Sequence, residues 1–181
     1  MNFVYETEHL YMQTLIESDA PILLDFCRRN ADFFAPFEPK QPERFLTEEY
    51  QRLMINGFSQ QFLRLQAARY YLFEKNRDDR IVGCVGLSEI HTGNDRCAKI
   101  LYKVDRLFCG RGYAVEASQK LISEAVSSLN LHRIEADILL SNEPSKRVAE
   151  KLGFEYEGIA RSSHKINGKW EDHARYALIC D

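Results

Sequence analysis

The pattern of apolar residues in this chain changes once between residues 97 and 129, and two glycines mark the change. Residues 97–104 are the last of three closely spaced strand candidates, whereas Val115, Leu121 and Ile122 belong to a series with helical spacing that ends at residue 129. Gly110 and Gly112 lie between the two segments. A strand must therefore turn tightly into a long helix here, and the fold has to accommodate that junction.

The other segments follow in the order strand, helices, three strands, then alternating elements. Besides residues 97–104, strands are predicted at residues 10–15, 70–73, 81–90, 133–140, 154–160 and 175–179, with polar turns at residues 76–79 and 92–95. Helices are predicted after residue 19, across residues 43–68 and over residues 141–152, and the Asn56-Gly57 pair is expected to split the second. Residues 1–181 are predicted to form one α/β (α+β) domain, with helices flanking a mixed sheet of about seven strands.

Composition and spacing exclude several functional classes. A net charge of −3 over 181 residues argues against a protein that coats nucleic acid, and no run of 18 apolar residues predicts a membrane span. The five cysteines lack a C-x-x-C pair and the five histidines lack H-x-x-x-H spacing, so neither a disulfide framework nor a metal site is predicted. The first ten residues lack the layout of a signal peptide, so a cytoplasmic protein is expected.

The loop at residues 109–114 is suited to bind phosphate. Two glycines allow several N–H groups to point the same way, and the following helix adds unpaired N–H groups and the positive end of its dipole. An ordinary glycine-rich turn is the alternative. Two other phosphate loops are excluded, because the chain has no G-x-x-x-x-G-K-[ST] string and this loop lacks the third glycine of G-x-G-x-x-G.

Several motifs in the second half of the chain resemble those of one enzyme family. Residues 109–114 have the form Q/R-x-x-G-x-G/A, except that Cys109 stands where Gln or Arg is usual. Further on come Leu-Asn-Leu-His-Arg-Ile-Glu-Ala at 129–136, Asn-Glu-Pro-Ser at 142–145, Glu-Lys-Leu-Gly-Phe at 150–154 and Asn-Gly-Lys-Trp at 167–170. Together they resemble the ribosomal-protein branch (RimJ/RimL type) of the GNAT N-acetyltransferase superfamily, over nearly the whole chain.

This resemblance implies acetyl-CoA as the acetyl donor and a sheet that splays between its fourth and fifth strands. The pantetheine arm would pair with the backbone of the fourth strand near Tyr102, Lys103 and Val104. Asn142 would hydrogen-bond the cofactor, and Lys151 would add charge near the phosphates, with a solvated helix face as the alternative for the lysine. The residues implied for the pyrophosphate are Cys109, Gly110, Arg111, Gly112, Tyr113 and Ala114.

The resemblance also implies which residues take part in proton transfer. Lys99 and Ala149 occupy the positions where many superfamily members have a Glu base and a Tyr acid, so that pair is not carried over. Ser145 matches a serine to which this branch assigns protonation of the leaving thiolate; the alternative is a first-turn residue bonded to nearby backbone. Glu89 and His164 are candidate bases, with a surface or structural role as the alternative for each.

The expected reaction is direct acetyl transfer to the α-amine of a ribosomal protein that begins with Ser or Ala. An α-amine with a pKa near 8 is roughly a tenth free at pH 7, whereas a lysine amine is free to only a few parts in ten thousand, so a weak base suffices. One alternative is a small amine acceptor, such as a polyamine or an aminoglycoside. A second is a non-catalytic acyl-CoA-binding module.

Four phenylalanines beside the early helices have three possible roles. Core packing is the default, and an acceptor groove or a homodimer contact is the alternative. They are Phe33, Phe34, Phe37 and Phe45.

Overall fold

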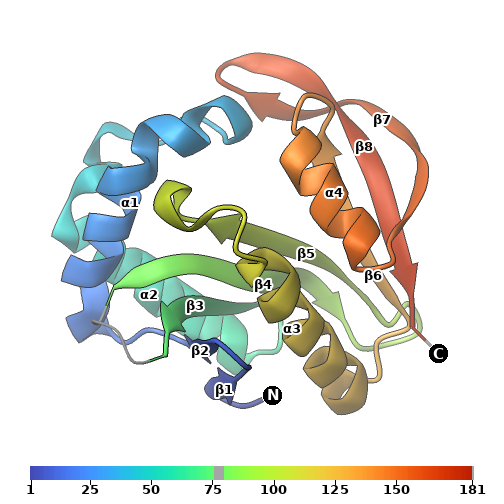
Figure 1. Cartoon of the computed structure of the whole chain (residues 1–181), viewed down its shortest axis with the longest axis horizontal. Coiled ribbons are helices and arrows are strands. Elements are labelled where there is room, and N and C mark those ends of the chain that lie inside the picture. The colour runs from blue at the N-terminus through green and yellow to red at the C-terminus, as the bar shows by residue number, and fades with distance from the viewer. Residues whose placement is uncertain (76–79, 181) are drawn as a thin grey trace.

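Eight strands pair into one open sheet in the order β1-β2-β3-β4-β5-β6-β8-β7 in the computed structural model, which describes residues 1–75 and 80–180 (Figure 1). The strands are β1 (Val4–Glu6), β2 (Leu10–Gln13), β3 (Ala68–Glu74), β4 (Ile81–His91), β5 (Cys97–Val104), β6 (Arg133–Leu139), β7 (Glu155–Ile166) and β8 (Lys169–Ile179). The α-helices are α1 (Ala20–Phe34), α2 (Glu48–Leu63), α3 (Tyr113–Leu129) and α4 (Glu143–Lys151). All strand pairs are antiparallel except β5 with β6.

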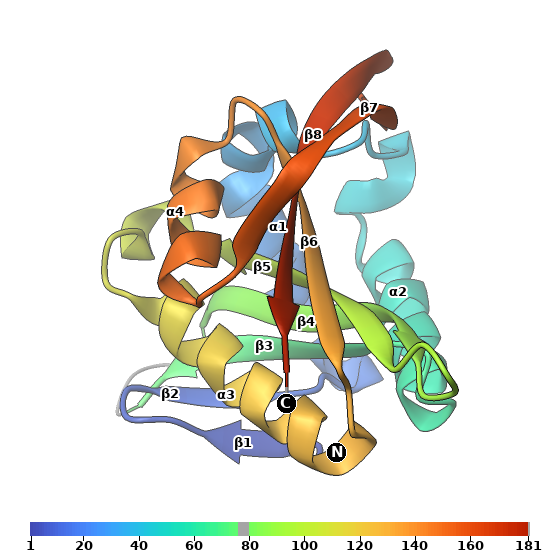
Figure 2. The same ribbon diagram turned by 90° about the vertical axis from the view of Figure 1, so that its right-hand side faces the viewer.

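The helices cover the two faces of the sheet in pairs. Figure 2 shows α3 and α4 on one side and α2 on the other, with α1 beside α2. Leu121 of α3 and Ala149 of α4 belong to one buried cluster, whereas Phe26 of α1 and Ile55 of α2 belong to a second. None of the described helices is long and apolar enough to cross a membrane.

Two expectations about the first half of the chain need correction. The sheet has one strand more than the seven predicted, because the three-residue β1 is too short to produce a recognisable alternation. Helix α2 is not split at Asn56 and Gly57 but continues through both residues. Its buried residues Gln51, Ile55 and Phe62 lie on both sides of the pair, and their packing outweighs the low helix propensity there. The turn predicted at residues 76–79 lies outside the described residues.

The β7–β8 hairpin is longer than predicted. The predicted turn is confirmed, since Asn167 and Gly168 have φ angles of 48° and 87°, the left-handed conformations that a two-residue hairpin turn requires. Residues 161–174 lack an apolar alternation because much of the hairpin extends past the core and is exposed. β7 is an edge strand, and its register with β8 shifts near Gly158 and Ser162, which have φ angles of 138° and 47°.

The predicted splay is confirmed between β5 and β6, which are the fifth and sixth strands because β1 precedes the others. The two strands pair only at Cys97 with Arg133, Ala98 with Ile134 and Lys99 with Glu135. Beyond this point β5 continues to Val104 and β6 to Leu139 without pairing to each other. The backbones of the two strands therefore diverge toward their carboxyl ends (Figure 1), and this gap between the strands is called the slot below.

A buried polar network fastens the far end of β5 to α1. Asp105, directly after β5, is 1% exposed and forms an ion pair with Arg29 of α1. The Asn30 amide donates to the Asp105 carboxylate over 3.1 Å, and the Arg106 N–H donates to Asn30 Oδ1 over 3.0 Å. These bonds stabilise the buried carboxylate and hold the end of β5 on α1, away from β6.

The packing of β4 against its neighbours predicts opposite effects of two Gly→Ala substitutions. A Cβ at Gly83 would lie 2.5 Å from the carbonyl oxygen of Lys103 and 3.2 Å from Leu72 Cδ1, so Gly83→Ala should lower the free energy of unfolding by about 1–3 kcal/mol. Gly57→Ala is the matched control, because its Cβ meets no atom within 4 Å and alanine favours helix; it should raise that energy by about 0.5–1 kcal/mol. Urea denaturation measures both, and equal stability of the two variants would contradict the packing.

Candidate active site

The glycine loop ahead of α3 presents a row of main-chain N–H groups. Gly110 and Gly112 have φ angles of 82° and 84°, and Gly112 is the residue that precedes the first turn of α3. Within the described part of the chain, no residue accepts a hydrogen bond from the N–H groups of residues 110–115, and the first bond of this turn runs from Glu116 N–H to the Gly112 carbonyl over 3.0 Å. Donors at a helix N-terminus fit a phosphate group.

Two side chains at this loop are held by one carboxylate, that of Glu74. Arg111 Nη1 donates to Glu74 Oε1 over 2.9 Å, and the hydroxyl of buried Tyr113 donates to the same oxygen. The Arg111 guanidinium lies 4.7 Å from the ring centre of Phe108. Arg111 and Tyr113 therefore fix the position of the loop through Glu74, a role for Glu74 that the sequence pattern did not indicate.

Cys109 begins the loop and is exposed, and its thiol points back toward the main chain. Its Sγ lies 3.6 Å from the carbonyl oxygen of Asp105. Partial burial raises the pKa of this thiol, so it stays protonated at neutral pH. The departure from Gln or Arg at this position leaves the main-chain donors of the loop intact.

Successive side chains of β5 point to opposite faces of the sheet, and the backbone edge of β5 beyond Lys99 faces the slot. On the other edge, Tyr102, Lys103 and Val104 pair with β4, at Val85, Cys84 and Gly83. The Tyr102 hydroxyl donates to the Ser145 carbonyl of α4 over 2.8 Å. The Lys103 ammonium lies on the opposite side, where it pairs with Glu38 and sits 5.6 Å from the ring centre of Phe34.

The start of α4 places a hydroxyl pair beside the slot. Asn142 precedes the helix, and its Oδ1 accepts the N–H of Ser145 over 3.2 Å, which is an N-cap bond. The Ser145 hydroxyl donates to the Tyr102 oxygen over 3.1 Å rather than to backbone. Burial raises the pKa of Tyr102 to about 12, so the pair stays protonated at neutral pH. Lys151, the last residue of α4, is exposed.

A cluster of charged side chains lies where the slot begins, on the α1–α2 side of the sheet. Lys99 Nζ is 3.1 Å from Glu89 and 3.4 Å from Asp137, and the Asp137 carboxylate is also 3.3 Å from Arg175 Nε and 3.6 Å from His164 Nε2. Burial acts to raise the pKa of Asp137, but Lys99 and Arg175 outweigh it and lower that pKa. Asp137 thus stays ionised and links Lys99 and Arg175 to the candidate base His164.

The candidate bases differ in how they are held. Glu89 has a φ angle of 51° at an irregularity in the β4–β5 pairing, and its carboxylate is engaged by Lys99. The His164 side chain is about half exposed, and its ring meets the ring of His173 edge-on, with centres 4.6 Å apart. Asp137 was missed because strand alternation gives the face of a residue but not its partners.

The orphan donors of the loop, the slot in the sheet and the hydroxyl pair fit a thioester cofactor with a diphosphate. The Acetyltransferase (GNAT) domain family matches this chain over residues 9–155. The protein is a GNAT acetyltransferase. Enzymes of this family use acetyl-CoA. Two parts of this chain would hold it: the N–H groups of residues 110–115, and the backbone edge of β5 beyond Lys99 that faces the slot.

Three similar proteins place this GNAT enzyme more closely. It is 36% identical to the "Probable N-acetyltransferase YjcK" of Bacillus subtilis, over 94% of this chain and 93% of that protein. It is 30% identical to the "[Ribosomal protein uS5]-alanine N-acetyltransferase" of Escherichia coli, over 95% of this chain and 88% of that enzyme. The crystal structure of the ribosomal-protein-S5-alanine acetyltransferase of Vibrio fischeri superposes with a TM-score of 0.92 and 30% identity, covering 99% and 98% of the chains.

The environment of His173 predicts a pH dependence of stability. His173 is 4% exposed, and burial lowers its pKa below the ordinary value of about 6.5. As the pH falls below about 6.5, His173 becomes protonated in the unfolded chain but stays neutral in the folded chain. The free energy of unfolding should therefore fall by at most about 1.4 kcal/mol per pH unit. The fall ends once the pH is below the folded-state pKa of His173. Urea denaturation at pH 7.5 and 5.5 measures this loss. His173→Gln should show a smaller loss, and an equal loss would contradict the assignment.

Proposed function

We propose that this enzyme acetylates the α-amine of a ribosomal protein whose first residue is Ser or Ala. The observation that carries the proposal is the hydroxyl pair of Ser145 and Tyr102 beside the slot of a GNAT fold whose relatives include an alanine N-acetyltransferase of ribosomal protein uS5. With a ribosomal acceptor, the reaction would take place in the cytoplasm. Residues 1–181 would act together as one catalytic domain.

Acetyl-CoA supplies the acetyl group as a thioester, and the chain's own groups position it and move protons. The N–H groups of residues 110–115 would hold the pyrophosphate, and the backbone of Tyr102, Lys103 and Val104 would pair with the pantetheine arm in the slot. The free amine then attacks the thioester carbonyl directly, so that a C–N bond forms and the C–S bond breaks. Ser145, whose hydroxyl donates to the Tyr102 oxygen in this structure, would give its proton to the departing thiolate and regain one from water.

The proton lost by the amine would leave on the α1–α2 side of the sheet, where His164 and Glu89 lie. His164 is the better candidate base, since its ring is half exposed and rests against Asp137, whereas the Glu89 carboxylate is engaged by Lys99. The Asp137 carboxylate oxygen lies 3.6 Å from His164 Nε2, on the side where the proton would arrive. An α-amine with a pKa near 8 needs only such a weak base.

Peptide acetylation tests the proposed function. The enzyme is incubated with acetyl-CoA and either a polyamine or peptides matching the N-termini of ribosomal proteins. Half of the peptides are blocked at the α-amine but carry a free lysine. We expect mass spectrometry to find one added acetyl group on the unblocked peptides alone. Transfer only to lysine side chains, or to a polyamine and to no peptide, would refute the proposal.

The hydroxyl pair predicts a separation of turnover from cofactor binding. Ser145→Ala should lower kcat about 10²-fold, because general-acid assistance is lost, and leave the dissociation constant for acetyl-CoA within about twofold. Ser141→Ala removes an exposed hydroxyl just before α4 and should leave both quantities unchanged. Steady-state kinetics and calorimetry provide the two measurements. An unchanged kcat for Ser145→Ala would remove this residue from the mechanism.

A further inference from the structure

A cavity of about 440 Å³ lies between α1, α2 and the sheet. Its volume falls in the range of sites that hold small organic groups, and rings form much of its wall. The rings belong to Phe26, Phe34, Phe45, Phe58 and Tyr71. Phe34 and Phe45 were expected in the core but are only half-buried, because they border this space.

The charges around the cavity balance one another. Three acidic residues, Asp32, Glu38 and Glu43, and three basic residues, Lys40, Arg69 and Lys103, line it. The Glu38 carboxylate is already paired with the Lys103 ammonium. A polyamine or an aminoglycoside would need an excess of carboxylates, which this wall does not provide.

Two cysteines of the cavity add no charge to it. Cys27 of α1 and Cys84 of β4 line it, and burial raises the pKa of both thiols, that of Cys27 to about 12. Both therefore remain neutral at pH 7 and behave as small apolar side chains. The cavity is thus suited to a bulky, neutral and apolar group.

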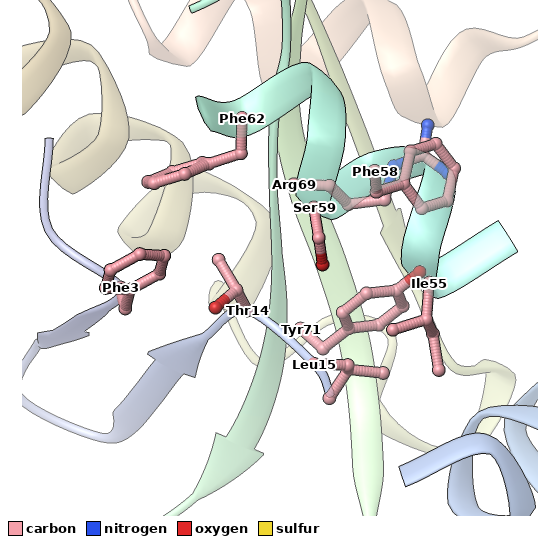
Figure 3. Close-up of a pocket in the computed structure, with 9 residues that line it drawn as sticks. All are labelled: Phe3, Thr14, Leu15, Ile55, Phe58, Ser59, Phe62, Arg69 and Tyr71. Carbon is pink, nitrogen blue, oxygen red and sulfur yellow. The ribbon is translucent and has the colours of Figure 1, made fainter. Parts of the chain in front are cut away.

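The inner end of the cavity is closed by stacked side chains. The Arg69 guanidinium lies 4.0 Å from the ring centre of Phe58, and both line a second cavity beyond, together with Tyr71 (Figure 3). That second cavity measures about 30 Å³, which holds roughly one water molecule. An occupant of the larger cavity therefore stops at Phe58 and Arg69.

The other end of the cavity lies beside the slot in the sheet. Lys103 lines the cavity, and it belongs to the part of β5 whose backbone edge faces the slot. Asn167 at the tip of the β7–β8 hairpin also lines it, and its side-chain amide donates to the Ala35 carbonyl after α1 over 2.8 Å. The hairpin tip and the end of α1 thus lie side by side (Figure 1). Lys99 and Lys103 are four residues apart on β5 and share one face of the sheet, so the cavity lies on the same side as Asp137 and His164.

We propose that this cavity binds a bulky, uncharged, apolar group of the acceptor close to its reactive amine. The proposal rests on the proposed function for the position of the thioester. A Ser or Ala side chain is far too small to fill the space, so in a peptide the group belongs to one of the two residues after the first. The enzyme then selects acceptors by that residue as well as by the first.

A peptide series and a pair of variants test the cavity. The peptides begin with Ser and carry Phe, Trp, Gly or Lys at position two or three; phenethylamine and spermidine represent small acceptors. Met54→Trp fills the cavity, since Met54 of α2 lines it, and Leu53→Trp is the matched control, because Leu53 is 56% exposed and lies outside the lining. Met54→Ala enlarges the space without adding bulk. Calorimetry with acetyl-CoA and circular dichroism check that each variant is folded.

We expect a Phe peptide to exceed the Gly and Lys peptides at least tenfold in kcat/KM, a difference of about 1.4 kcal/mol. Met54→Trp should reduce this preference to about twofold, Leu53→Trp should retain it, and Met54→Ala should shift it from Phe toward Trp.

Peptides acetylated equally well, or best with Lys, would overturn the inference while the proposed function stands. Transfer to phenethylamine but to no peptide, sensitive to Met54→Trp, would refute the proposed function and support the cavity. Preference for spermidine would overturn the inference.

Discussion

The attachment of β5 to α1 through Asp105 is the constraint on which the site depends. In the described part of the chain, β5 keeps its pairing with β4 as far as Val104 but has no partner strand on the β6 side beyond Lys99. Asp105 is almost completely buried, and its carboxylate takes its partners, Arg29 and Asn30, from α1. Because a buried carboxylate is stable only with such partners, the end of β5 stays on α1 and the slot remains open. The glycine loop begins four residues after Asp105, so the same anchor also fixes where its N–H groups lie.

Under the proposed function, the two faces of the sheet have separate roles in catalysis. On the α3–α4 face, the cofactor is expected to meet mostly main-chain donors and the hydroxyls of Ser145 and Tyr102. On the α1–α2 face, the acceptor is expected to meet side chains, from Asp137 to the aromatic rings of the large cavity. Because the donors of the glycine loop are main-chain N–H groups, a side-chain difference such as Cys109 leaves them in place. Side chains on the other face can change without disturbing these donors. This arrangement explains how one fold serves many acceptors.

The sequence predicted the elements whose signals are local. The glycine loop, the helix after it and the Asn167-Gly168 turn each depend on a few neighbouring residues, and the structure contains all three. The partners of Asp137, Glu38 and Glu74 were not predictable in this way, since they come from distant strands and from a loop between helices. The splay was expected from the family resemblance alone, because the single-sequence pattern of β5 and β6 is that of ordinary strands. Which residues carry out proton transfer remains a prediction for the measurements above.

The irregular edge of β7 has a consequence for the behaviour of the enzyme at high concentration. A long, flat edge strand offers unsatisfied backbone groups to other chains and promotes aggregation. β7 is 12 residues long, but the turns in its backbone at Gly158 and Ser162 interrupt the row of groups that a visiting strand would need. The hairpin can thus extend past the core to reach α1 and still resist the formation of intermolecular sheets.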